Sequence, residues 1–290
     1  MKVLLIGSSG QVGQELGRLL KEPLTVVQLS RQQLDLTNLE QTYQTVVDQR
    51  PDWVINAAAY TAVDGAESEL ELAHRINGEA PGVLAKAAAD CNAAMVHFST
   101  DYVFDGAQGR PYLESDPPCP VSAYGRSKLA GEEAVKAANP QHLIVRTAWV
   151  YGSRGKGNFV KTMLRLGADR PVIKVVSDQV GTPTWANDIA ETTARLITLP
   201  VAETAGTYHF TSSGAISWYD FAIAIFSEAL ELGLLTNAPD IVPITTAEYP
   251  TVAQRPANSA LYCTKLRDLL GQAPPYWRDS LRQMLRELVS

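Results

Sequence analysis

The sequence VLLIGSSGQVG, at residues 3–13, carries the strongest structural signal in the chain. Its four apolar residues predict a short buried strand, and Gly7, Gly10 and Gly13 follow in a GxxGxxG pattern. Such glycines allow a tight turn that approaches a pyrophosphate closely, and the N-terminus of the following helix offers free N–H groups. Because the motif lies between a predicted strand and a predicted helix, we predict a dinucleotide-phosphate site.

Short apolar runs recur along the first half of the chain, and stretches with helical spacing separate them. Each run is apolar at consecutive positions, as expected of parallel strands that are covered on both faces. This alternation predicts right-handed βαβ units, and therefore an α/β fold with a doubly wound parallel sheet of the Rossmann type. The further strands are expected at 24–29, 53–56, 94–98 and 143–146, and the helices at 12–20, 39–49, 67–90 and 122–138.

The alternation weakens after residue 150, where glycine, proline and turn residues become frequent. We predict a dinucleotide-binding Rossmann domain over residues 1–150, with 171–210 returning to it. Residues 151–170 and 211–290 are predicted to form a smaller, interleaved C-terminal lobe that binds the substrate.

The composition excludes several classes of protein. The chain has 25 Lys and Arg against 31 Asp and Glu, and no basic run, so a nucleic-acid partner is not expected. No stretch of about 18 apolar residues predicts a membrane span. Three scattered cysteines indicate a reducing, cytoplasmic setting. The histidines form no close ligand pair, and we expect each of them to be structural; they are His74, His97, His142 and His209.

The end of the second predicted strand bears on the choice of cofactor. An acidic residue there would bind the ribose hydroxyl of NAD, but residues 29–33 read LSRQQ. Arg31 is suited to the 2′-phosphate of NADPH, which we therefore prefer, with NADH as the alternative. Asp35 is placed for the adenine amino group. The small residues after the third strand, in NAAAY at 56–60, allow a flat ligand to approach closely.

A catalytic group is predicted from two separate segments. Tyr124 and Lys128 lie four residues apart and therefore on one face of a helix. A nearby ammonium lowers the pKa of a phenol toward the range in which it can exchange protons. Thr100 follows the strand at 94–98, at the sheet edge where open α/β folds bind ligands, and its hydroxyl can bond an oxygen that gains charge.

In this order, the segments GxxGxxG, NAAA, STDYVF and YxxxK resemble the extended short-chain dehydrogenase/reductases. TAVD at 61–64, RTAWVYG at 146–152 and DQVGTPT at 178–184 make the chain similar to their dTDP-4-dehydrorhamnose reductase branch, over about residues 1–285. The resemblance implies reduction of the C4 ketone of dTDP-6-deoxy-L-lyxo-4-hexulose to dTDP-L-rhamnose by hydride transfer from NAD(P)H. That product serves the synthesis of cell-surface polysaccharide.

The resemblance also implies roles for single residues. Tyr124 would donate the proton, Lys128 would lower its pKa and hold the nicotinamide ribose, and Thr100 would orient the carbonyl group. The implied substrate contacts are Thr100, Asp101, Tyr124, Trp149, Arg255 and Asn258. The predicted cofactor contacts, from pattern and resemblance together, are Gly7, Gly10, Gln11, Val12, Gly13, Ser30, Arg31, Asp35, Leu36, Ala57, Ala58, Ala59, Tyr60, Thr61, Tyr124 and Lys128.

Some points stay open at this stage. Some family members are metal-linked dimers that use an acidic residue matching Glu15, but one carboxylate cannot hold Mg²⁺, so metal and homodimer remain open. Within enzymes, the alternative is a sugar-nucleotide epimerase or dehydratase, although a dehydratase would carry a second acid after Asp101. The alternative outside enzymes is a non-catalytic, NADP-binding regulatory subunit of methionine adenosyltransferase.

Overall fold

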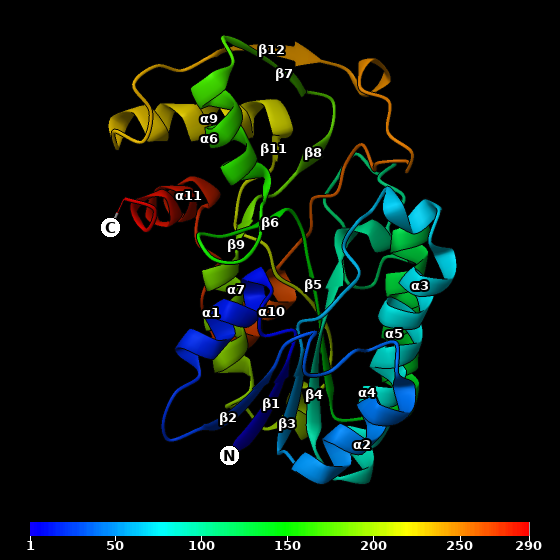
Figure 1. Cartoon of the computed structure of the whole chain (residues 1–290). Coiled ribbons are helices and arrows are strands. Elements are labelled where there is room, and N and C mark those ends of the chain that lie inside the picture. The colour runs from blue at the N-terminus through cyan, green and yellow to red at the C-terminus, as the bar shows by residue number, and fades with distance from the viewer. Residues whose placement is uncertain (290) are drawn as a thin grey trace.

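The computed structural model describes residues 1–289. Six parallel strands form one sheet, in the order β10-β5-β4-β3-β1-β2 (Figure 1). The predicted α/β fold with a doubly wound parallel sheet is therefore confirmed. The strands are β1 (Lys2–Ile6), β2 (Thr25–Leu29), β3 (Trp53–Asn56), β4 (Ala94–Thr100), β5 (His142–Thr147) and β10 (Gly206–His209).

Helices cover both faces of this sheet (Figure 1). Because successive strand residues point to opposite faces, Val3 and Leu5 join one apolar core while Leu4 and Ile6 join the other. Both cores are closed to water, which explains why most of the strands contain runs of consecutive apolar residues. One face carries α1 (Gln11–Leu19), α7 (Ala186–Leu196) and α10 (Thr264–Leu270), and the other carries α2 (Leu39–Gln49), α4 (Ala80–Asp90) and α5 (Ala123–Ala138).

A smaller lobe lies beyond the carboxyl ends of the strands (Figure 1). In it β7 (Val172–Val176) pairs with β12 (Asp240–Ile244), and Phe221 and Trp277 lie in a separate aromatic core. Its helices are α6 (Phe159–Asp169), α9 (Trp218–Glu231) and α11 (Trp277–Arg286).

Residues 171–210 are predicted to return to the first domain, and the elements of this segment pack in two different places. β7 lies in the smaller lobe, because Ile173 and Val175 pack into its aromatic core. α7 and β10 do pack with the large sheet, and so does α10 from the C-terminal part of the chain. The division of the chain into two domains stays a prediction.

The helix predicted over 67–90 is interrupted. It consists of η1 (Gly65–Glu67), α3 (Leu70–His74), a π-helical turn η2 (Arg75–Glu79) and α4. Such π turns insert one residue into a helix and frequently occur at functional sites. The remaining short elements are η3 (Asp101–Val103), β6 (Val150–Tyr151), β8 (Val180–Gly181), β9 (Thr184–Trp185), α8 (Val201–Thr204), β11 (Ile216–Ser217) and η4 (Thr246–Glu248).

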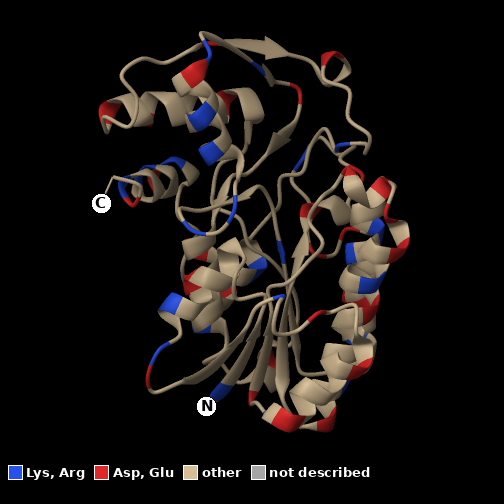
Figure 2. Ribbon diagram, viewed as in Figure 1, with Lys and Arg blue, Asp and Glu red and all other residues tan. Residues whose placement is uncertain are grey.

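Charged residues lie mainly on the helices and loops, and the strands of the large sheet are almost free of them (Figure 2). Lys and Arg are interspersed with Asp and Glu, and no continuous basic stripe faces the viewer (Figure 2). Among residues 1–289, no helix combines the length and the apolar character needed to cross a lipid bilayer.

Candidate active site

The glycine turn joins β1 to α1, and its glycines allow backbone packing too close for a side chain. Gly7 has a φ of +80°, and a Cβ there would lie 2.5 Å from the Ala58 nitrogen. A Cβ at Gly13 would lie 2.1 Å from the Gly7 oxygen. α1 begins after Gly10 and has no side-chain cap, so its first N–H groups are available to a ligand. This cradle fits the pyrophosphate of a dinucleotide.

The residues after β2 are placed for the adenosine end of such a ligand. Arg31 is exposed, and among residues 1–289 its guanidinium has no ion-pair partner within 4 Å. The exposed Asp35 accepts a hydrogen bond from the Thr37 N–H (3.0 Å), which lowers the pKa of its carboxyl group. Leu36 is buried, and Ser30 bonds to the Gln33 side chain (2.8 Å). Arg31 is therefore free to meet a phosphate.

The strand order of the large sheet reverses between β1 and β3. The chain passes from β1 to β2 on one side and to β3 on the other, and ligands bind where strand order reverses in this way. Ala57, Ala58, Ala59 and Tyr60 follow β3 and are half-buried, whereas Thr61 is exposed.

Asn77, in the π turn, is a site residue that the sequence analysis missed. Its Oδ1 accepts from the Tyr60 N–H (2.8 Å), and its Nδ2 donates to the Tyr60 oxygen and to the Ser127 Oγ (both 3.0 Å). It therefore ties the loop after β3 to α5, which carries Tyr124 and Lys128. Helical periodicity alone gives no signal for the π turn that directs this side chain inward.

A buried hydroxyl network forms where β4 ends. The Thr100 hydroxyl donates to the Asp101 Oδ1 (2.9 Å) and accepts from the Tyr102 N–H (3.2 Å). The Thr100 side chain lies beside the Tyr124 phenol and acts on its pKa. The Tyr102 ring meets the Tyr124 ring edge-on, with centroids 5.6 Å apart. The structure thus brings Thr100, Asp101 and Tyr124 together, as the sequence analysis expected of neighbouring site residues.

The protonation of this network differs from the expectation. We predicted that the Lys128 ammonium lowers the pKa of Tyr124, but burial raises that pKa, and the Thr100 side chain offsets only part of the effect. The Lys128 Nζ instead donates to the Phe98 oxygen (2.7 Å). Burial lowers the pKa of Lys128 to about 8, against the opposing effect of Glu132. Tyr124 is therefore a protonated phenol at neutral pH.

Asp101 is a buried carboxyl group with an unusual proton affinity. Burial raises its pKa to about 6, although the hydrogen bond from Thr100 and the nearby Ser259 side chain act in the other direction. Ser259 comes from the loop before α10 and is itself buried. Residues distant in the sequence therefore close around the hydroxyl network.

The other predicted substrate residues have different surroundings. Trp149 has a φ of +47° and stacks on Trp218, with ring centroids 3.4 Å apart. Arg255 donates to the Asp64 Oδ2 (2.6 Å) and to the Tyr102 hydroxyl (3.1 Å), so it reaches the edge of the network. Asn258 does not: its Nδ2 donates to the Gln108 and Arg110 oxygens (2.8 and 3.3 Å) and braces that loop.

Glu15 is fully buried, and two arginines neutralise it. Its Oε2 accepts from the Arg18 Nε (2.9 Å), and its Oε1 lies 3.4 Å from the Arg154 Nε. Nowhere in residues 1–289 do three or more His, Cys, Asp or Glu side chains gather as metal ligands. These surroundings do not fit Mg²⁺, because guanidinium groups already supply the positive charge and a hard cation needs several oxygen ligands.

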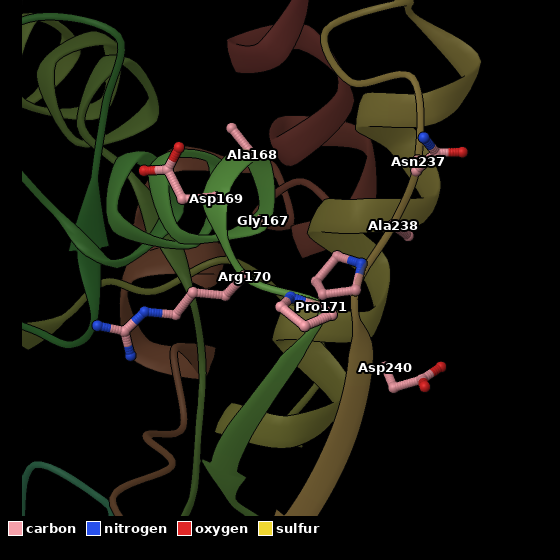
Figure 3. A pocket seen from close by; sticks show the side chains of 9 residues that line it. Gly167, Ala168, Asp169, Arg170, Pro171, Asn237, Ala238 and Asp240 are labelled. Carbon is pink, nitrogen blue, oxygen red and sulfur yellow. The ribbon is translucent and has the colours of Figure 1, made fainter.

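A hollow of about 350 Å³ lies in the smaller lobe, between the end of α6 and the segment that leads into β12. Its Asp169, Arg170 and Asp240 side chains point in different directions rather than toward one point (Figure 3). It therefore shows no convergent polar group of the kind that binds a small molecule.

Comparisons with known proteins agree with this geometry. A family model described as RmlD substrate binding domain matches residues 1–290. The chain is 47% identical to a dTDP-4-dehydrorhamnose reductase of Burkholderia thailandensis over 100% of both chains. It resembles the crystal structure of a dTDP-4-dehydrorhamnose reductase from Clostridium acetobutylicum (TM-score 0.93, 41% identity, 100% of both chains). It also resembles that of the Bacillus anthracis enzyme in complex with NADP (TM-score 0.92, 38% identity, 99% of both chains).

Proposed function

The chain belongs to the family of the dTDP-4-dehydrorhamnose reductases, and from this premise we propose that it reduces dTDP-4-dehydrorhamnose to dTDP-L-rhamnose with NADPH. It is thus an NAD(P)H-dependent oxidoreductase. The observation that carries the proposal is the pair of the buried Thr100 and the half-buried Tyr124 at the carboxyl edge of the sheet, in the same fold as an uncapped, glycine-lined helix N-terminus.

Different residues of this chain have different roles in the proposed reaction. When bound, NADPH supplies the hydride for the C4 carbon. Tyr124, held as a neutral phenol by burial, donates a proton to the C4 oxygen. Thr100 hydrogen-bonds that oxygen and orients the carbonyl group, as preorganised donors do where charge develops. Lys128, four residues from Tyr124 on the same helix, would hold the nicotinamide ribose.

We propose that successive segments of the chain hold successive parts of the cofactor. The pyrophosphate lies on the first N–H groups of α1, beside Gly10, Gln11 and Val12, and Asp35 bonds the adenine. The exposed Arg31 favours NADPH over NADH, and the family likeness to an NADP-bound structure supports this choice. Asp101 and Trp149 contact the sugar nucleotide. A cytoplasmic setting and a homodimer stay predictions, and the three free cysteines support the former.

A product assay tests the proposal. The protein is incubated with NADPH and, separately, with several 4-keto sugar nucleotides that differ in base and sugar. We expect stoichiometric NADPH oxidation and a dTDP-6-deoxyhexose product with the dTDP-linked substrate. Tight NADPH binding without turnover on any of them would contradict the proposal and would favour the regulatory-subunit reading. Release of an epimerised or dehydrated product without NADPH oxidation would favour the other enzyme classes.

A further inference from the structure

His97 is a buried titratable group that the proposed mechanism does not use. It lies in β4 with 0% of its surface exposed. Its Nδ1 is 3.2 Å from the Asn56 Nδ2, and its Nε2 is 3.4 Å from the Lys128 Nζ. The imidazole therefore lies between Asn56, at the end of β3, and Lys128 on α5.

The neighbours of His97 fix which of its nitrogens carries the proton. The Asn56 Oδ1 accepts from the Ala58 N–H (3.1 Å), so the amide must turn its Nδ2 toward His97 as a donor. Burial and the nearby Lys128 lower the pKa of His97 well below its usual range, which keeps the ring neutral. A neutral imidazole has one N–H and one acceptor. Because Nδ1 must accept, the proton lies on Nε2 and faces Lys128.

This arrangement acts on the charge of Lys128. An ammonium has three donors and no acceptor, so an N–H that faces it disfavours the charged form, whereas a neutral amine can accept that N–H. Glu132, one turn further along α5, acts in the opposite direction. Its carboxylate, however, is held by the Arg146 guanidinium in two hydrogen bonds (2.8 and 2.7 Å). Tyr124 and Asp101 belong to the hydroxyl network where β4 ends.

We propose that His97 is a positioning residue for Lys128: its Nε2–H, oriented by Asn56, holds the amine at the Phe98 oxygen and favours release of its extra proton. Lys128 can then give that proton to the phenolate left when Tyr124 protonates the C4 oxygen, and it becomes a neutral amine instead of remaining a fixed cation. This inference rests on the proposed function, because Lys128 matters only in a site that exchanges protons beside a bound dinucleotide.

The first test reads the imidazole directly and needs no turnover. ¹⁵N NMR of the full chain labelled at histidine should show a ring that stays neutral at pH 6, with Nε2 protonated and Nδ1 unprotonated. The resonance is assigned by its loss in His97→Gln. Asn56→Asp, which offers a carboxylate to Nδ1, should move the proton to Nδ1. A wild-type ring protonated at Nδ1, or at both nitrogens, would overturn the proposal even if the reductase activity is confirmed.

The second test reads Lys128 through the pH profile of kcat. His97→Leu removes the opposing N–H, so the basic limb should move up by about 0.5–1 pH unit. His97→Gln keeps an N–H in the place of Nε2 and should restore the wild-type limb. His209→Leu, a matched change at another buried histidine, should leave the limb in place. If His97→Leu folds and the basic limb of its kcat profile stays in place, the proposal is contradicted. If His97→Leu does not fold, Asn56→Asp replaces it as the test: its ¹⁵N spectrum should show the proton on Nδ1, and its basic limb should move to higher pH.

Discussion

A phenol that stays protonated at neutral pH is well suited to quench an alkoxide. At Tyr124 this state results from burial, and the neighbouring Thr100 hydroxyl limits how far the pKa rises. The structure brings both residues together, as predicted, whereas burial rather than Lys128 governs the pKa of Tyr124. Spacing places the two side chains on one helix face, yet it cannot show that Nζ turns to the Phe98 oxygen.

Tyr124→Phe should lower kcat by about 10²–10⁴-fold, because the reaction loses its general acid. The dissociation constant for NADPH should change little, since the ring itself remains. Steady-state kinetics and fluorescence titration measure the two quantities. Tyr43→Phe, at a half-buried tyrosine on α2 whose hydroxyl bonds Asp90, is the matched control and should behave like the wild type. Survival of turnover in Tyr124→Phe would show that another group donates the proton.

Asp101→Asn should stabilise the protein at neutral pH. Folding raises the pKa of this carboxyl group from 3.8 to about 6. The group therefore adds to the free energy of unfolding below pH 3.8, and this contribution is lost as the pH rises through 6. The substitution removes that loss, so urea unfolding at pH 7.5 should show a gain of about 1–3 kcal/mol that shrinks toward pH 4. Activity should fall.

Asp105→Asn is the control for that measurement, and it should have the opposite sign. Bonds from the Ala107 N–H and the Tyr112 hydroxyl lower the pKa of Asp105. Asp105 therefore adds to the free energy of unfolding at pH values above its pKa in the unfolded chain, and this contribution disappears as the pH falls. The variant should be less stable than the wild type at pH 7.5 and equally stable in acid. The same sign in both variants would refute the account of Asp101.

Arg31→Ala should reduce the preference for NADPH. If its guanidinium binds the 2′-phosphate, kcat/KM for NADPH should fall by about 10–100-fold, in line with the loss of a charge-assisted pair. NADH has no such phosphate and serves as the internal control, with kcat/KM nearly unchanged. Equal losses with both cofactors would mean that Arg31 only supports the loop.

At the scale of elements, the loop after β3 depends on a side chain from a distant helix turn. Asn77 is buried and satisfies both backbone groups of Tyr60 while it bonds Ser127 of α5. One amide therefore sets the distance between the loop expected to contact the cofactor and the helix expected to carry the proton donor. The geometry needed for binding is thus held by contacts between elements rather than by the loop itself.

Asn77→Ala should weaken NADPH binding by about 5–30-fold, because the loop loses two backbone hydrogen bonds worth about 1 kcal/mol each. Isothermal titration calorimetry measures the dissociation constant. Asn38→Ala is the matched control: Asn38 caps α2 by accepting from the Gln41 N–H, so its loss should lower stability without affecting NADPH. Equal effects of the two variants on binding would contradict the role of Asn77.

Sequence patterns predicted the elements of the large sheet closely. Residues 39–49 and 53–56 match α2 and β3, because consecutive apolar positions and a capping Asn38 give local signals. α9 was missed, although Ser217 and Asp220 form a capping box, because it is apolar on most of its surface and reads without clear periodicity. The Asn77 clamp and the Trp149–Trp218 stack depend on tertiary contacts, which a single sequence does not display.

At the scale of the whole molecule, a polar link connects the large sheet to the loop before α10. Arg255 bonds Asp64, in the loop after β3, and Tyr102, which touches Tyr124. Arg255 is a substrate contact implied by the family resemblance, and that role stays a prediction. Its observed partners also allow it to hold the two parts of the molecule around the reacting groups.

Arg255→Met should raise KM for the sugar nucleotide by about 5–30-fold, since a partly buried charge-assisted bond of about 1–2 kcal/mol is lost. NADPH affinity should remain within about twofold, because the expected pyrophosphate contacts lie at α1. Arg267→Met, on an exposed arginine that pairs only with its neighbour Asp268, is the control and should leave KM unchanged. A loss confined to NADPH binding would contradict this placement.

The paired indoles of Trp149 and Trp218 have an optical consequence. Their planes are 6° from parallel and their centroids are 3.4 Å apart, so their electronic transitions couple strongly. One chromophore follows β5 and the other begins α9, so the near-ultraviolet spectrum of the pair reports on the contact between these two segments. The protein thus contains a label-free spectroscopic probe of how the chain after β5 meets α9.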